Sequence, residues 1–157
     1  MRRARMADQK AHDNPLALRF SRIFEADQEF VFKALTRPDL IRKWFGPHGY
    51  TCPVVEVDLR VGGTYHIEMK PPEGGIIKLN GVYNIVNPPN ALEYTWQWDE
   101  PDAKQTKVKV QFSPSGNGTE VFVEQGEFAG TESKEGHEQG WLASFDRLKE
   151  FSQARKT

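Results

Sequence analysis

The sequence predicts an α+β domain in which a curved antiparallel sheet of about seven strands wraps around one long C-terminal helix. Alternation of apolar and polar residues recurs between residues 52 and 125, with short turns between the runs. The pattern then becomes helical, because Trp141, Phe145 and Leu148 follow one another at i, i+4 and i+7. A chain of 157 residues with 38% hydrophobic side chains can bury one core but hardly two.

The N-terminal part is expected to supply a tail and the first strand. Residues 1–15 are polar and basic and predict a disordered or extended tail, so we expect a single domain over residues 16–157. Within that domain, residues 16–24 alternate well enough to predict a strand.

Two short helices are expected after this strand. The first begins at Asp27, whose carboxylate suits the N-cap position, and the second covers residues 38–45 and ends at a Gly-Pro pair. Trp44 and Phe45 are adjacent at its end and therefore point about 100° apart. We expect Trp44 to anchor the helix on the sheet and Phe45 to face the rim of a cavity.

The remaining strands predict a sheet with one dry face and one wet face. Tyr65, Ile67 and Met69 share one side of their strand, and the polar residues between them take the other. Asn117-Gly118 is a strong hairpin signal between the last two strands. Six consecutive strands joined by short turns predict an antiparallel meander, followed by a helix over residues 132–154.

Composition limits the class of partner and the kind of chemistry. With 21 basic and 22 acidic side chains the net charge is −1, which favours neither nucleic acid nor an anionic membrane as partner. Cys52 is the single cysteine, so no intrachain disulfide can form, and the four histidines lack metal-ligand spacing. No apolar stretch of about 18 residues occurs. We therefore expect a cytoplasmic protein, monomeric or homodimeric, without metal or other cofactor.

The dry face is expected to enclose a cavity. One helix of about 10 Å diameter cannot fill the hollow of a curved sheet along its whole length. The inward residues also include many tyrosines and tryptophans, whose polar tips need partners when buried. Apolar walls with a few convergent donors are typical of a small-molecule pocket. The candidate ligand-binding residues are Phe45, His48, Tyr65, Ile67, Met69, Tyr83, Tyr94, Trp96, Trp98, Phe112, Trp141 and Phe145.

Several ordered segments resemble one known family. They are FKALTRPDLIRKWFGP (32–47), VGGTYHIEM (61–69), NGVYNIVNPPNALEYTW (80–96), GTEVFVEQGEF (118–128) and HEQGWLASFDRLKEF (137–151). Together they resemble the helix-grip fold of the START and birch-pollen-allergen (SRPBCC) superfamily. Within it they are similar to the family named after the C-terminal domain of the activator of the ninety-kilodalton heat-shock chaperone ATPase. The resemblance covers about residues 16–153 and implies the fold more strongly than the function.

Three functions remain open on the sequence. The inward aromatics favour binding of a small hydrophobic or aromatic molecule between the sheet and the C-terminal helix. The resemblance implies a second function, an interaction module that stimulates a chaperone ATPase in a stress response. The third is an enzyme acting on a hydrophobic substrate, cyclase-like or hydrolase-like, with His48, Tyr65 and Tyr83 as candidates. No catalytic residues are assigned, because no convincing acid–base pair or nucleophile motif occurs in the sequence.

Overall fold

The computed structural model describes residues 15–155, and the tail expected over residues 1–15 therefore lies outside the described residues except for Pro15. The sheet is formed by β1 (Leu18–Phe24), β2 (Thr51–Val57), β3 (Thr64–Lys70), β4 (Ile77–Asn87), β5 (Ala91–Trp98), β6 (Thr106–Ser115) and β7 (Gly118–Gly126). The helices are α2 (Gln28–Thr36), α3 (Pro38–Ile41) and α4 (Thr131–Ala154).

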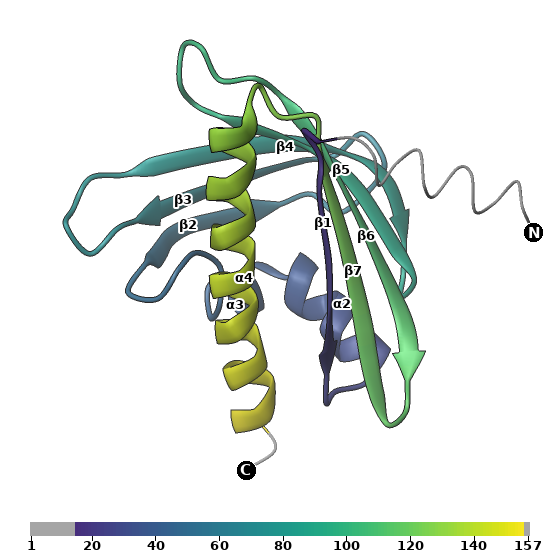
Figure 1. Cartoon of the computed structure of the whole chain (residues 1–157). Coiled ribbons are helices and arrows are strands. Elements are labelled where there is room, and N and C mark those ends of the chain that lie inside the picture. The colour runs from purple at the N-terminus through teal and green to yellow at the C-terminus, as the bar shows by residue number, and fades with distance from the viewer. Residues whose placement is uncertain (1–14, 156–157) are drawn as a thin grey trace, which may run out of the picture.

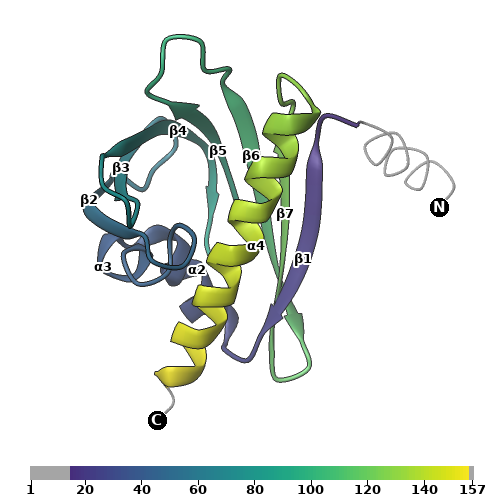
Figure 2. The ribbon, with the colours of Figure 1, turned by 60° about the vertical axis from the view of Figure 1, so that its left-hand side comes forward.

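The seven strands form one antiparallel sheet in the order β1-β7-β6-β5-β4-β3-β2. Strands β2 to β7 are a meander, and β1 joins it at the edge of β7, where Phe20 lies opposite Val123. The sheet curves around α4, which crosses its hollow from one end to the other, while α2 and α3 close one end (Figure 1, Figure 2). The predicted α+β architecture is confirmed.

The main core lies between α4 and the concave face of the sheet. Phe145 is fully buried and makes edge-on contacts with Phe20 and Phe24 of β1, at ring-centroid distances of 5.3 and 5.4 Å. Leu148, one turn further along α4, is also buried. Burying each such side chain contributes about 1.5–3 kcal/mol, so this stripe fixes α4 against β1.

The short helices begin and end for local reasons. The Asp27 carboxylate caps α2 by accepting a hydrogen bond of 2.8 Å from the backbone N–H of Phe30. Helix α3 ends at Ile41, earlier than the expected residue 45, and an irregular turn continues the chain. In that turn the backbone N–H groups of Trp44 and Phe45 both donate to the Ile41 carbonyl oxygen. The two aromatics therefore leave the helix on a turn.

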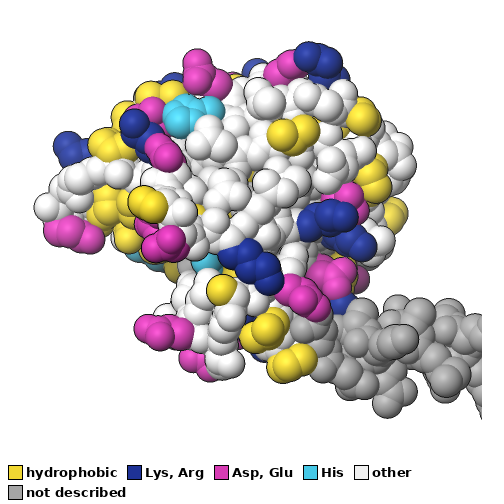
Figure 3. All heavy atoms as spheres, turned by 90° about the horizontal axis from the view of Figure 1, so that it is seen from above, with side chains coloured by type: hydrophobic (Ala, Val, Ile, Leu, Met, Phe, Trp, Pro, Cys, Tyr) yellow, Lys and Arg dark blue, Asp and Glu magenta, His cyan; other side chains and the backbone are white. Residues whose placement is uncertain are grey.

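Neither sign of charge dominates the face of the molecule seen from above. Acidic, basic and hydrophobic side chains are interspersed on the face shown in Figure 3. Within residues 15–155, no helix combines the length and the apolar composition that crossing a membrane requires.

Candidate ligand-binding cavity

A cavity of about 530 Å³ lies beside the N-terminal half of α4. Its walls come from the loop between α3 and β2 (residues 44–50), from β5 and the loop after it, and from residues 128–144. Met69 and Ile77, from β3 and β4, complete the wall on the sheet side. The volume lies within the range of small-molecule sites, about 300–1,000 Å³.

The cavity persists because one face of α4 carries small residues. Ser133, Gly136, Gly140 and Ser144 line it at spacings of three and four residues, which places them on one side of the helix. A Cβ atom added at Gly136 or Gly140 would meet no neighbouring atom within 4 Å. Glycine costs a helix about 1 kcal/mol relative to alanine, so α4 carries this open face at the expense of its own stability.

Trp96 lies at the centre of an aromatic cluster on the cavity wall. Its ring centroid is 5.4 Å from Trp98, 5.5 Å from Trp141, 6.0 Å from His137 and 6.1 Å from Phe45. All five side chains line the cavity. Their ring faces and edges present the surfaces on which a flat aromatic molecule stacks, with a gain of about 0.5–1.5 kcal/mol for each well-placed pair.

The polar atoms of this wall are mostly paired with each other. Trp98 Nε1 donates to His137 Nε2 at 2.8 Å, and His137 Nδ1 donates to the Ser133 carbonyl oxygen at 2.8 Å. His137 must therefore be neutral to accept from Trp98, and burial lowers its pKa below the usual value of 6.5. Trp141 Nε1 donates to Gln125 Oε1 at 2.7 Å.

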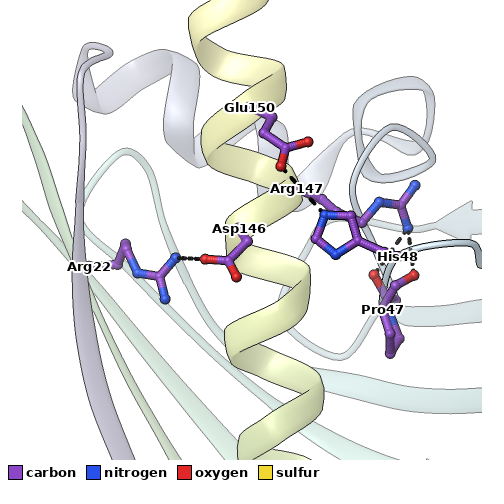
Figure 4. A network of polar contacts seen from close by, with 7 residues as sticks. Arg22, Pro47, His48, Asp146, Arg147 and Glu150 are labelled. Atoms are coloured by element: carbon purple, nitrogen blue, oxygen red, sulfur yellow. Dashed lines mark hydrogen bonds and ion pairs between the residues drawn. The ribbon is translucent and has the colours of Figure 1, made fainter.

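The loop between α3 and β2 is tied to α4 by one cation. Arg147 Nη1 donates to the carbonyl oxygens of Phe45, Gly46, Pro47 and Tyr50 at 3.0–3.3 Å. Figure 4 shows Arg147 reaching this loop from the helix. Because four of these loop residues also line the cavity, Arg147 holds one of its walls in place.

His48 belongs to the same loop but lies outside the cavity lining. Its Nε2 is 3.5 Å from Glu150 Oε1, and both side chains are exposed, so the pair is a surface contact of small energy (Figure 4). Asp146, on the same helix, instead pairs with Arg22 of β1 at 2.6 Å.

Five of the twelve candidate residues line the cavity. They are Phe45, Met69, Trp96, Trp98 and Trp141. Trp44 lines it as well, and it is also the buried anchor, 2% exposed, with Nε1 donating to the Ala34 carbonyl oxygen at 2.8 Å. The expected division between Trp44 and Phe45 is therefore less sharp than the sequence suggests, because Trp44 both anchors and lines.

Four further candidates line a separate small void of about 30 Å³. They are Tyr65, Ile67, Tyr83 and Tyr94, with the three tyrosine rings 5.4–5.8 Å apart. Tyr65 Oη donates to the Thr95 carbonyl oxygen at 2.6 Å, and burial raises the pKa of all three phenols. This void borders the same aromatic wall, since Phe45 and Trp96 line both spaces.

Phe112 and Phe145 lie in the packed core, outside both lining sets. Phe112 packs on Phe32 of α2 with ring centroids 5.2 Å apart. Cys52 is buried near the Phe45 carbonyl oxygen, and burial raises the pKa of its thiol to about 11, which keeps it protonated and unreactive. Among the described residues, no group of three or more histidine, cysteine or acidic side chains is placed to hold a metal ion.

Comparison with known families agrees with this architecture. The family model described as "Activator of Hsp90 ATPase homolog 1-like protein" matches residues 25–153. The chain belongs to this family. None of the curated proteins compared with the chain matches it.

Solved structures of this fold cover almost the whole chain. Protein CV1439 from Chromobacterium violaceum is 26% identical with a TM-score of 0.82, over 88% of this chain and 97% of that one. The AHSA1 protein from Silicibacter pomeroyi is 26% identical with a TM-score of 0.78, over 88% and 99%. Protein NE0264 from Nitrosomonas europaea is 24% identical with a TM-score of 0.78, over 92% and 98%, and supports the fold alone.

In this family member, sequence reasoning missed the α4 face of the cavity. His137 is not among the twelve candidate ligand-binding residues, yet it lines the cavity and accepts a hydrogen bond from Trp98. A signal was present, because His137 precedes Trp141 by four residues and Gly136 precedes Gly140 by four. Two glycines in register inside an expected helix indicate that something other than side-chain packing occupies that face.

Proposed function

We propose that the protein reversibly binds a small hydrophobic or aromatic molecule in the cavity between the sheet and α4. The observation that carries the proposal is an aromatic-walled space of about 530 Å³, kept open on its helical side by two glycines and two serines of α4. Membership of the family supports it, since the same fold supports small-molecule partners.

The expected affinity follows from the size of the ligand. At about 0.4 kcal/mol per heavy atom, an aromatic molecule of about 15 heavy atoms binds with about 6 kcal/mol. That free energy corresponds to a dissociation constant of about 40 µM. Extra hydrogen bonds or a closer fit would lower the dissociation constant.

A neutral fluorescent naphthalene, N-phenyl-1-naphthylamine, tests the proposal directly. Titration should quench tryptophan emission by energy transfer, because Trp96, Trp98 and Trp141 line the cavity, and should raise the melting temperature. Phe112→Leu is the matched control, because Phe112 packs on α2 outside the cavity; it should lower stability and leave the affinity within twofold. Absence of saturable quenching across several neutral aromatic probes would count against the proposal.

A chaperone partner is a second candidate supported by the family alone. Co-purification with the cognate heat-shock chaperone, together with an ATPase assay, tests it. The enzyme hypothesis has less support, because its candidates are dispersed: Tyr65 and Tyr83 line the small void, and His48 is on the surface.

A further inference from the structure

The indole nitrogen of Trp96 is a buried donor without a partner. The other three tryptophans donate to Ala34, His137 and Gln125, respectively. Trp96 Nε1 has no hydrogen-bond partner within residues 15–155, although its side chain is 7% exposed and lines the cavity. Buried polar atoms in native structures nearly always find a partner, so this nitrogen requires an explanation.

The other unused hydrogen-bonding capacity of the cavity includes further donors. Thr106 Oγ1 already accepts from Gln125 Nε2 at 2.9 Å, which leaves its hydroxyl hydrogen to donate. The Ser144 hydroxyl also lines the cavity and can donate a hydrogen bond. Both ring nitrogens of His137 are occupied by Trp98 and Ser133. A matching ligand therefore presents acceptors.

Charges on the lining disfavour a ligand that carries a negative charge. Glu100, Asp102 and Lys104, in the loop after β5, line the cavity and sum to −1. None of the lining residues offers a cation in the aromatic part of the wall, since His137 is held neutral. A buried carboxylate on the ligand would lack a compensating charge, whereas a carbonyl or ether oxygen needs none.

We propose that the ligand is a neutral aromatic molecule whose carbonyl or ether oxygen accepts a hydrogen bond from the indole N–H of Trp96. This inference rests on the proposed function. Because neighbouring side chains cover the nitrogen, the indole must turn toward the cavity when the bond forms. The bond then satisfies the one indole that the fold leaves unpaired.

Two compounds of matched shape separate the hydrogen bond from hydrophobic binding. 2-Acetylnaphthalene carries a carbonyl oxygen where 2-ethylnaphthalene carries two hydrogens. In Trp96→Phe, which removes the N–H and keeps an aromatic ring, the affinity for the ketone should fall about tenfold, equivalent to about 1.4 kcal/mol. The affinity for the hydrocarbon should change less than threefold. Trp98→Phe makes the same replacement where the N–H is already committed to His137, and should change both affinities together.

Each outcome separates the inference from the function on which it rests. If neither naphthalene binds the wild-type protein, the proposed function fails. If both bind and Trp96→Phe weakens them equally, the function stands and the inference is overturned. An independent readout is the Trp96 indole N–H signal in a ¹H–¹⁵N spectrum, assigned by its loss in Trp96→Phe. It should move downfield with the ketone and not with the hydrocarbon; equal shifts with both compounds would also overturn the inference.

Discussion

Replacing Gly140 by leucine is expected to stabilise the protein while weakening ligand binding. The added Cβ meets no neighbouring atom within 4 Å, so the side chain can enter the cavity without displacing the wall. Removing a glycine from the interior of α4 should contribute about 1 kcal/mol. For a protein of this size that gain raises the melting temperature by about 2–4 °C.

The loss of binding follows from the space that the side chain takes. Four added carbons exclude about four ligand heavy atoms, which at about 0.4 kcal/mol each amounts to about 1.6 kcal/mol, or about fifteenfold in dissociation constant. Melting curves and titration with N-phenyl-1-naphthylamine measure the two effects on the same sample. Opposite signs are diagnostic, because a variant that merely unfolds loses both stability and binding.

Gly130→Ser is the control for this experiment. Gly130 is the N-cap of α4 and lies outside the cavity lining, and serine there adds a capping hydroxyl. Its stability should rise by a few tenths of a kcal/mol with an unchanged affinity. If Gly140→Leu binds the probe as tightly as the wild type, the cavity beside α4 is not the binding site and the reasoning is refuted.

Two further predictions concern the loop and the histidine. Arg147→Met removes the donor from four carbonyl oxygens and should lower the free energy of unfolding by about 1–3 kcal/mol, with faster hydrogen exchange at Tyr50. The control Arg22→Met breaks a surface pair and should lower it by less than about 1 kcal/mol. Equal losses in the two variants would contradict the role of Arg147. Burial lowers the pKa of His137 in the folded protein, so the unfolded chain takes up a proton at this residue more readily. The free energy of unfolding should therefore decrease as the pH falls below 6.5. In melting curves from pH 8 to 5, His137→Gln should lose less stability at acid pH than the wild type, and an unchanged slope would exclude His137 as the cause. His66 contributes with the opposite sign, because its hydrogen bond to Glu68 raises its pKa.

Periodicity was sufficient for the main elements of the fold, because several strands and α4 carry a regular pattern. The alternation through Tyr94, Trp96 and Trp98 identified a strand, and the stripe through Phe145 identified the long helix. Periodicity could not show which inward side chains border the larger cavity and which border the small void. Tyr94 and Trp96 both belong to the aromatic set expected to face inward, but only the curvature of β5 and the position of Phe45 decide which space each one borders.

The face of α4 was missed for a different reason. Aromatic residues in the sequence indicate the aromatic walls of the cavity, but they give no sign of the side of α4 where Gly136 and Gly140 have no side chains. Gly136 and Gly140 contribute nothing to a hydrophobic pattern, and Ser133 and Ser144 resemble exposed positions. His137 was omitted from the candidate residues because its partner Trp98 lies 39 residues away in the sequence and meets it only in the folded protein.

The thin partition between the two interior spaces separates two determinants of ligand choice. Trp44, Phe45 and Trp96 line both the larger cavity and the void that Tyr65, Tyr83 and Tyr94 border. A smaller residue at position 45 would join the spaces and lengthen the site inward, leaving the loop after β5 and the α4 face as they are. The length of the ligand that fits would then depend on the residue at position 45, whereas Trp98, Trp141 and His137 would still contact the ring of the ligand.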